Sequence, residues 1–336
     1  MNTNIISEEY SLIQSKYEKL GQNIVQALEL FLNEDKIDFL SIYHRVKDKN
    51  SFLEKIERKK YEKPFEQIED ICGVRIICYY QSDLQNIANI IKKEFEILEN
   101  QDKEDLLNAD QFGYRSTHFI VKVNAKWLQA PNYRGLENLK IEIQIRTVLM
   151  HAWAEIEHKL AYKKDIHIPK ELKRKLYRIS AKLEEADEQF EELKNSILDY
   201  KTEVIKHLND EELVNLKIDL NLDSLQSFLD LNFPDRTRNL EMTSDLVDEF
   251  VKYKITLDDL KSSYDKIKKF LPEIEEEIFK EKSLMNKGWA QVGIARNIMD
   301  LTNEKYREER DVPEEIKELD RKWAKKILAY QNKNSR

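Results

Sequence analysis

The sequence predicts an α+β protein with a mixed first part and an all-helical second part. Before about residue 168, short segments rich in β-branched and aromatic residues alternate with segments whose apolar residues recur at helical spacing. From Pro169 onward almost every segment is charged and amphipathic. The interruptions in this second part lie near Leu220, Pro234, Pro272 and Pro313.

Within the first part, the apolar spacing predicts each element in turn. Tyr10, Ile13 and Tyr17 begin a helical repeat over residues 8–33, and the run from Val74 to Tyr80 is typical of a buried strand. Asn50 or Ser51 is expected to cap the next helix. Further strands are expected at 38–44, 116–123 and 139–145, further helices at 51–60, 84–98 and 147–158, and a polar loop at 99–113.

The composition excludes several classes of protein. The chain is 41% hydrophobic and 36% charged, with six glycines and six prolines, which is typical of a soluble, helix-rich protein. Its formal charge of -8 argues against a protein that coats nucleic acid with its whole surface. There is no export signal and no apolar run of about 18 residues, so we expect a cytoplasmic protein without a membrane span. Cys72 and Cys78 are expected to be buried and reduced.

A first group of candidate residues is basic. Ser51, Lys55 and Arg58 fall at i, i+4 and i+7, on one face of the predicted helix, and Arg45 and Lys47 precede them. Such an array suits a triphosphate, because it combines point charges, a guanidinium and a helix N-terminus. Taken alone, the pattern also fits a solvated basic helix.

A second group surrounds the buried strand that begins near Val74. Asp70, Gly73 and Arg75 stand at its start, where a glycine lets a ligand approach closely and an unpaired charge is costly to bury. Two interpretations stay open for this motif, a ligand site or an Asp70–Arg75 ion pair that serves the structure alone.

A third group combines an aromatic residue with a polar strand face. Tyr114 follows a glycine and precedes His118, which suits a stacking surface beside polar donors but, taken alone, fits an ordinary turn with an inward-packed tyrosine better. Alternation places Glu142, Gln144 and Arg146 on one face of the 139–145 strand and its continuation. A strand face with an acid, an amide and a guanidinium side by side is unfavourable in a hydrophobic core, and it suits the wall of a polar cleft. His151, Glu155 and His158 recur at helical spacing, but the interval between the histidines does not match a zinc helix. Asp70 and Glu142 together could hold Mg²⁺ on a polyphosphate.

The order of these motifs resembles the synthetase domain of the RelA/SpoT alarmone synthetases. The matching residues run from Arg45-x-Lys47 through Asp70-x-x-Gly73-x-Arg75 and Gly113-Tyr-Arg-Ser-x-His118 to Glu142-Ile-Gln-Ile-Arg-Thr147 and Trp153-Ala-Glu-Ile-Glu-His158. The resemblance implies a nucleotidyltransferase-like mixed sheet flanked by helices. It also implies a synthetase domain over residues 1–200 and a helical accessory or regulatory region over 201–336.

The resemblance implies a reaction and a role for each matching residue. The family transfers the β,γ-pyrophosphate of ATP to the 3′-hydroxyl of GDP or GTP and releases AMP. Asp70 and Glu142 would bind Mg²⁺, and Glu142 would help to deprotonate the hydroxyl. The residues that would bind ATP are Arg45, Lys47, Ser51, Lys55, Arg58 and Arg75, and those that would bind the acceptor nucleotide are Tyr114, His118, Gln144, Arg146 and His151.

Two features depart from the long members of this family. The chain has no His-Asp dipeptide, so we expect it to make product without degrading it. It also continues for about 130 residues past the usual end of the small synthetases. This extension is expected either to support oligomerisation or to act as an inhibitory or partner-sensing region, as in relatives that are toxins controlled by antitoxins.

The acceptor stays open between a guanosine nucleotide and the 3′ end of tRNA. A basic patch would suit an RNA backbone, a regulatory nucleotide or solvent. It consists of Lys170, Lys173, Arg174, Lys175, Arg178 and Lys182. The partners expected from the sequence are therefore ATP with GDP or GTP, with tRNA, a second copy of the chain and a protein regulator as alternatives.

Overall fold

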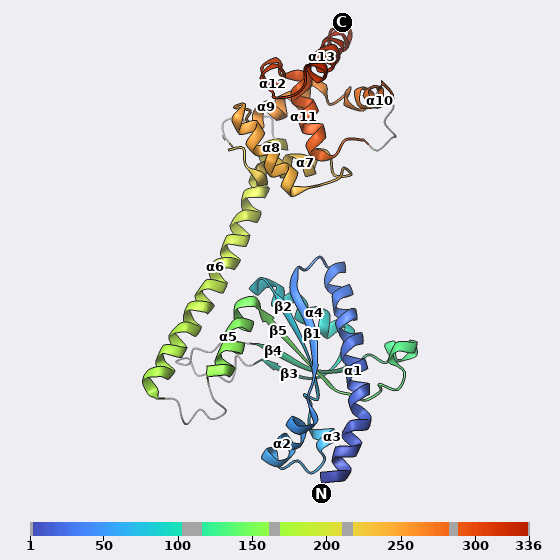
Figure 1. Cartoon of the computed structure of the whole chain (residues 1–336), viewed down its shortest axis with the longest axis vertical. Helices are drawn as coiled ribbons and strands as arrows, with labels where there is room; N and C mark the ends of the chain where they lie inside the picture. The colour runs from blue at the N-terminus through green and yellow to red at the C-terminus, as the bar shows by residue number, and fades with distance from the viewer. Residues whose placement is uncertain (1–2, 103–115, 161–168, 210–217, 282–287, 335–336) are drawn as a thin grey trace. The chain divides into compact units, whose positions relative to one another are not determined.

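The computed structural model describes residues 3–102, 116–160, 169–209, 218–281 and 288–334 (Figure 1). The chain divides into two compact units, Met1–Lys194 and Asn195–Arg336, and each is described by itself.

A five-stranded sheet forms the centre of the first unit. Its strands are β1 (Phe39–Val46), β2 (Cys72–Cys78), β3 (Phe95–Asp102), β4 (Thr117–Val123) and β5 (Ile141–Thr147). They lie in the order β1-β2-β5-β4-β3, with β2 and β5 parallel and the other neighbours antiparallel. The expected mixed sheet flanked by helices is therefore confirmed.

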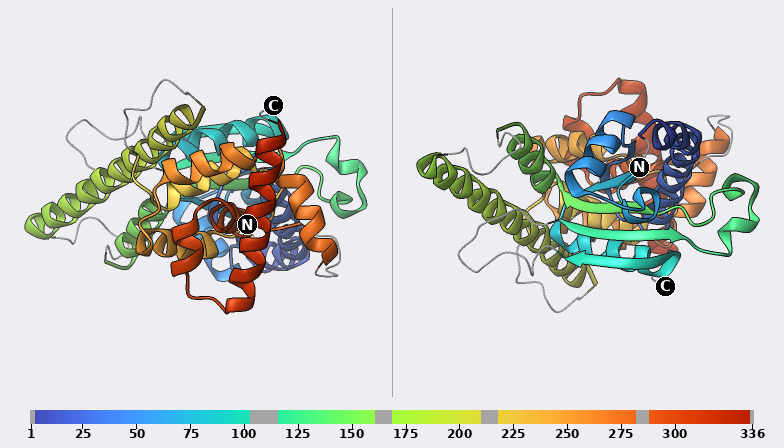
Figure 2. Two further views of the ribbon diagram at one scale, coloured as in Figure 1. Left: turned by 90° about the horizontal axis from the view of Figure 1, so that it is seen from above. Right: turned by 90° about the horizontal axis from the view of Figure 1, so that it is seen from below.

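The first unit contains six helices and two short 3₁₀ turns in its described residues. The helices are α1 (Thr3–Glu34), α2 (Lys49–Lys59), α3 (Pro64–Gln67), α4 (Gln81–Glu94), α5 (Val148–Leu160) and the 40-residue α6 (Lys170–Asn209), which continues into the second unit. The 3₁₀ turns are η2 (Trp127–Gln129) and η3 (Pro131–Tyr133). Helix α1 lies along β1, as Figures 1 and 2 show.

The two faces of the sheet differ in chemistry because alternate residues point to opposite sides. Val74 and Ile76 of β2 and Ile143 of β5 are fully buried and belong to the same core cluster as Leu20 of α1 and Ile91 of α4. Helices α1 and α4 thus cover the apolar face. The other face carries the polar alternates of the same strands and faces α5, which contacts β5 and β2.

Two local expectations were wrong. The helix expected at 84–98 ends at Glu94, and residues 95–102, expected as helix and loop, form β3. Phe95 and Ile97 pair with β4, and that pairing outweighs the helical spacing. The cap of α2 is Asp48, whose carboxylate accepts from the backbone N–H of Ser51 at 2.9 Å.

The second unit is helical throughout its described residues. It contains the end of α6 and α7 (Leu222–Asn232), α8 (Leu240–Lys252), α9 (Leu257–Ile267), α10 (Leu271–Glu281), α11 (Gln291–Thr302), α12 (Glu304–Glu309) and α13 (Glu314–Asn334). Buried Phe228, Phe250, Ile298 and Trp323 belong to its own hydrophobic core. The expected helical region after the sheet is confirmed.

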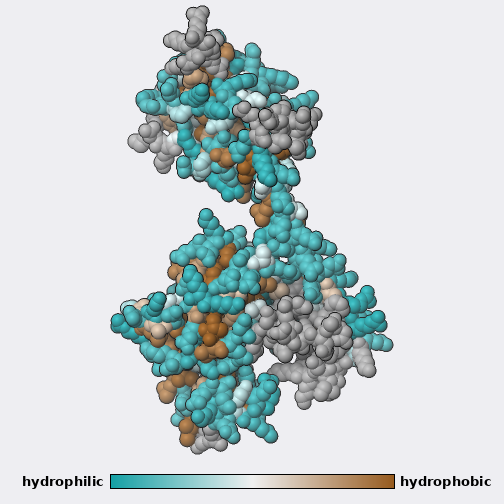
Figure 3. All heavy atoms as spheres, turned by 180° about the vertical axis from the view of Figure 1, so that it is seen from behind, coloured by the Kyte–Doolittle hydropathy of each residue, from teal (hydrophilic) through white to brown (hydrophobic). Residues whose placement is uncertain are grey.

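The surface of the described residues is mainly hydrophilic, with exposed apolar side chains in separate patches (Figure 3). None of the helices in the described part of the chain is both long enough and apolar enough to pass through a bilayer.

Candidate active site

The register of the sheet brings the predicted site residues onto its polar face. Arg45 of β1 lies opposite Gly73 of β2, and Gly73 lies opposite Glu142 of β5. One step along, Arg75 lies opposite Gln144, which in turn lies opposite His118 of β4. Because partners on neighbouring strands point to the same side, motifs far apart in the sequence share one surface.

Asp70 lies just before β2 and forms ion pairs with two lysines. Lys55 Nζ lies 2.7 Å from its Oδ1, and Lys47 Nζ lies 3.2 Å from its Oδ2. Partial burial alone would raise the pKa of this carboxyl group, but the hydrogen bond from Lys55 and the two positive charges hold it below its ordinary value. Asp70 is therefore a carboxylate at neutral pH, with both lysines oriented toward it.

Glu142 is held by a short chain of hydrogen bonds. His118 Nδ1 lies 2.7 Å from Glu142 Oε1, and His118 Nε2 lies 2.6 Å from Ser116 Oγ. Burial would raise the pKa of Glu142, but the bond to His118 outweighs it and the pKa is below its ordinary value. An ionised Glu142 accepts from Nδ1–H, and in the neutral imidazole Nε2 then accepts from the Ser116 hydroxyl. His118 is only 5% exposed and contacts the carboxylate directly.

Gly73 leaves space beside the second oxygen of Glu142. Among the residues that the structure describes, a Cβ at position 73 would meet only Glu142, at 3.9 Å from Oε2 and 4.0 Å from the backbone oxygen. The packing of the described residues therefore does not require a glycine here. The absent side chain opens the surface in front of Oε2, where a ligand can approach.

Arg75 pairs with α5. Its Nη1 lies 2.7 Å from Glu155 Oε1 and 3.3 Å from Tyr43 Oη. Burial would lower the pKa of Arg75, but the bonds to Tyr43 and Glu155 raise it above its ordinary value. The interpretation of Asp70 and Arg75 as an ion pair is wrong, because each has other partners.

Arg146 and His151 each carry a buried nitrogen that has no hydrogen-bond partner in the described part of the chain. Arg146 Nη2 donates to Gln144 Oε1 at 3.0 Å, but Arg146 Nε and His151 Nδ1 have no hydrogen-bond partner among the residues that the structure describes. Burial and the nearby Arg75 lower the pKa of Arg146, and burial lowers that of His151. Such groups are costly unless a ligand or water satisfies them.

The other predicted residues lie at the edge of this surface or outside the described chain. Arg45 and Arg58 are exposed, and the Ser51 hydroxyl bonds to Asp48 Oδ2 at 2.7 Å. Tyr114 falls within residues 103–115, outside the described residues.

Comparisons with known proteins agree with this constellation. A family model described as a region found in RelA / SpoT proteins matches residues 44–167. The chain is 34% identical over 172 residues to the GTP pyrophosphokinase YwaC of Bacillus subtilis, an overlap of 50% of this chain and 70% of that protein. It is 34% identical over 158 residues to the GTP pyrophosphokinase YjbM of the same organism, covering 46% and 71%.

The chain belongs to the RelA/SpoT family. Among solved structures, the small alarmone synthetase 1 of Bacillus subtilis is 28% identical, with a TM-score of 0.48 over 57% of this chain and 99% of that one. The family match ends at residue 167, so α6 and the helices of the second unit lie beyond it.

Two residues of this candidate site were missed by sequence reasoning. Ser116 was passed over although it stands two residues before His118, and that spacing on an extended strand signals a shared face. Glu155 was considered only as a zinc ligand and rejected. Its contact with Arg75 joins positions 80 residues apart, which no local pattern could show.

The donor set suits a hard divalent cation that is shared with a polyphosphate. No three His, Cys, Asp or Glu side chains gather into a metal cluster within the described ranges. Mg²⁺ bound with a nucleotide needs only one or two protein carboxylates, since phosphates and water complete its shell. Asp70 and Glu142 supply two, and they are close enough for the charge of Asp70 to raise the pKa of Glu142.

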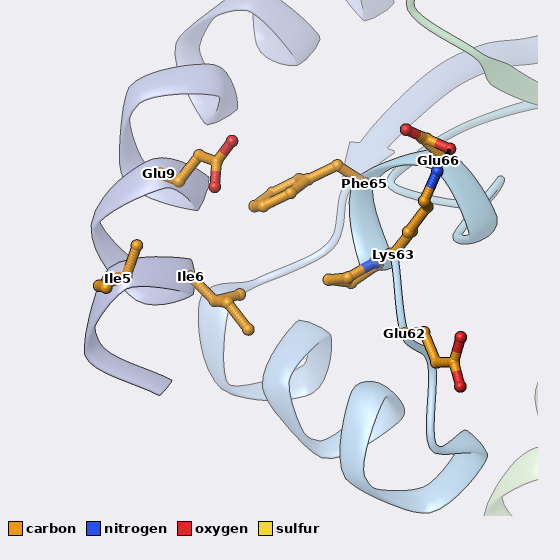
Figure 4. Close-up of a pocket in the computed structure, with 8 residues that line it drawn as sticks. Ile5, Ile6, Glu9, Glu62, Lys63, Phe65 and Glu66 are labelled. Carbon is orange, nitrogen blue, oxygen red and sulfur yellow. Dashed lines mark hydrogen bonds and ion pairs between the residues drawn. The ribbon is translucent and has the colours of Figure 1, made fainter. Parts of the chain in front are cut away.

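A separate pocket lies away from these residues. It has a volume of about 380 Å³ and is formed by the start of α1 and the segment around α3, with Ile6 and Phe65 at its apolar wall and Glu9, Glu62 and Glu66 around it (Figure 4). None of the predicted site residues lines it, so it is not part of the candidate active site.

Proposed function

We propose that this RelA/SpoT chain is a Mg²⁺-dependent pyrophosphokinase that transfers the β,γ-pyrophosphate of ATP to the 3′-hydroxyl of GDP or GTP. The two curated relatives are GTP pyrophosphokinases at 34% identity, which supports this chemistry. The observation that carries the proposal is the polar face itself. It combines a lysine-bound Asp70, a histidine-held Glu142 and an open surface at Gly73.

The donor site would be built on the basic residues around Asp70. Lys47 and Lys55 already converge there, and ATP phosphates entering beside Asp70 would share these charges. Ser51 and Arg58 of α2 would hold the phosphates further out. Arg45 and Arg75 would stack on the two faces of the adenine.

The acceptor site would centre on Glu142. In the transfer, the 3′-oxygen of the acceptor forms a bond to the β-phosphorus of ATP, the bond from that phosphorus to the α,β-bridging oxygen breaks, and AMP leaves. Glu142 would take the hydroxyl proton, since it is ionised at neutral pH and its Oε2 faces the open side. His118 positions the carboxylate through Oε1, which leaves Oε2 for the substrate.

Three neighbours of Glu142 would bind the acceptor nucleotide. The nitrogens of Arg146 and His151 that lack a partner among the described residues suit phosphate or ribose oxygens, and Gln144 orients Arg146. Tyr114 would stack on the base. Mg²⁺ held by Asp70 and Glu142 would neutralise negative charge on the polyphosphate.

One assay tests the reaction and the acceptor together. The purified chain is incubated with γ-labelled ATP and Mg²⁺, and is offered GDP, GTP or deacylated tRNA in separate reactions. We expect label on the guanosine nucleotide with an equal amount of AMP, and no transfer when EDTA removes the metal. Label on tRNA alone would show that the proposed acceptor is wrong, and transfer that is unaffected by EDTA would contradict the metal site.

A further inference from the structure

Helix α5 places an acid on the polar face of the sheet, against a cation of β2. Glu155 Oε1 lies 2.7 Å from Arg75 Nη1, although the two residues are 80 positions apart in the sequence. The same nitrogen donates to Tyr43 Oη at 3.3 Å, and Tyr43 lies opposite Arg75 in the register of β1 and β2. Trp153 of α5 is only 3% exposed, so the helix is anchored beside the sheet. The guanidinium of Arg75 is therefore held from two elements, β1 and α5.

The pair of Glu155 and Arg75 is too exposed to serve mainly as a source of stability. The side chain of Glu155 is 50% exposed and that of Arg75 is 30% exposed. Exposed ion pairs contribute little to stability, because solvent screens them and because ordering two long side chains costs entropy. The contact does provide a fixed position for a guanidinium that would otherwise sample several rotamers. A group that is ordered before its ligand arrives binds the ligand more tightly.

Glu155 also lies close to two basic residues on the acceptor side. His151 precedes it by four positions, which places both on one face of α5, and the charge of Glu155 acts on His151 and on Arg146 of β5. Burial alone would raise the pKa of Glu155, but the hydrogen bond from Arg75 and the charge of that guanidinium hold it below its ordinary value. Glu155 is therefore a carboxylate at neutral pH, and it offsets part of the positive potential around Arg146 and His151.

We propose that Glu155 is a positioning residue with opposite effects on the two substrates of the pyrophosphate transfer. On the donor side it holds Arg75 in place for the adenine of ATP. On the acceptor side its negative charge weakens the binding of GDP or GTP phosphates near Arg146 and His151, because like charges repel. The inference rests on the proposed function, in which Arg75 stacks on adenine and Arg146 and His151 bind the acceptor nucleotide.

Binding of each ligand to the full-length chain tests the two effects separately. Isothermal titration calorimetry with Mg²⁺ gives the Kd of α,β-methylene ATP, whose bridging carbon prevents transfer, and a separate series gives the Kd of GDP. In Glu155→Gln, which keeps the shape of the side chain, the analogue should bind about two- to fivefold more weakly, the scale of an exposed ion pair. GDP should bind about two- to fivefold more tightly, since a negative charge near its phosphates is removed.

Two further variants separate the position of Arg75 from the charge of Glu155. Tyr43→Phe removes the other hydrogen bond to Arg75 and leaves the charge unchanged, so it should weaken binding of the analogue and leave the Kd of GDP unaltered. Glu18→Gln is the matched control, because the side chain of Glu18 is also 50% exposed and its carboxylate lies 2.8 Å from a basic side chain, that of His44. Glu18 belongs to α1, which covers the opposite face of the sheet, so both Kd values should equal those of the wild type.

The results that would overturn this inference differ from those that would overturn the proposed function. Weaker binding of both ligands in Glu155→Gln, or an unchanged Kd for either, would exclude opposite effects, because a purely structural role weakens both ligands or neither. If Tyr43→Phe changed the Kd of GDP as much as Glu155→Gln does, the charge of Glu155 would not be the cause. A wild-type chain that puts no label on a guanosine nucleotide in the transfer assay would overturn the proposed function and, with it, this inference.

Discussion

At the scale of single residues, the site depends on which partner each charged group has. Alternation in the sequence correctly predicted that Glu142, Gln144 and Arg146 lie on one strand face. It left two interpretations of Asp70 open, a ligand site or an ion pair with Arg75. In the structure, Asp70 forms ion pairs with Lys47 and Lys55, and Arg75 forms an ion pair with Glu155. Alternation along a strand predicts a shared face, whereas partner choice depends on how α2 and α5 pack, which local spacing does not encode.

Removing the charge of Asp70 should abolish most of the transfer. In Asp70→Asn, the phosphates and Mg²⁺ lose a carboxylate, so we expect kcat to fall by roughly 10²–10³-fold, the scale of a lost electrostatic contact in a transition state. The measurement is AMP release with saturating ATP and GDP. Glu69→Gln is the matched control, since its carboxylate pairs with Lys140 at 2.8 Å. Equal activity of the two variants would contradict the role of Asp70.

Two glycines should respond to alanine in opposite ways. Among the described residues, the new Cβ of Gly73→Ala meets only ordinary contacts, so the free energy of unfolding should not fall, while the methyl group beside Glu142 Oε2 should lower kcat/KM. In Gly21→Ala the new Cβ would stand 2.4 Å from His44 Cδ2, and this overpacking should cost about 1–3 kcal/mol of stability.

Urea unfolding and steady-state kinetics on both glycine variants separate the two effects. Wild-type kinetics in Gly73→Ala would show that the space at Glu142 is not used by a substrate.

At the scale of elements, apolar periodicity predicted most helices and strands and failed where two periods overlapped. Phe95 and Ile97 continue the helical spacing of α4, but they also fit the two-residue alternation of a strand. The segment forms a strand because it pairs with β4. The cap of α2 was missed because Asp48, Asn50 and Ser51 are all good caps. Only the backbone shows that Asp48 accepts from Ser51 N–H.

The contacts among α11, α12 and α13 predict a pH-dependent stability. Asp300 is 4% exposed, and burial, with Asp320 nearby, raises its pKa to about 6 although Arg310 pairs with it. A carboxyl group whose folded pKa exceeds its unfolded value of 3.8 favours folding when protonated. Its contribution is therefore lost as pH rises from about 4 to 6, by at most about 3 kcal/mol.

Asp300→Asn isolates that contribution because asparagine cannot ionise. The variant should gain stability relative to the wild type as the pH is raised from 4.5 to 7. Calorimetric Tm values of both proteins across this range give the difference directly. A difference that stays constant with pH would mean that Asp300 is already ionised at the acidic end.

At the scale of the whole molecule, the change of composition at Pro169 marks the start of α6 and not the division between the units. The first unit extends to Lys194 because Asp187, Glu191 and Lys194 bind residues of the sheet and of α4. The change in composition marks the point after which the chain forms no further strands. The boundary of the first unit is set by the last residues that contact its sheet and helices. The two hydrophobic cores share no residue, since the first ends at Ile145 and the second begins at Val204.

Separate cores predict that the synthetase part can be isolated. A chain that ends at Asp199 keeps every residue of the first core and every α6 contact to the sheet, and it omits Val204, the first residue of the second core. We expect this fragment to unfold cooperatively and to retain pyrophosphate transfer. A rate above that of the full chain would indicate that residues 200–336 restrain the enzyme, and an equal rate would assign them another task. A fragment that lacks a cooperative transition would show that the first core depends on the second.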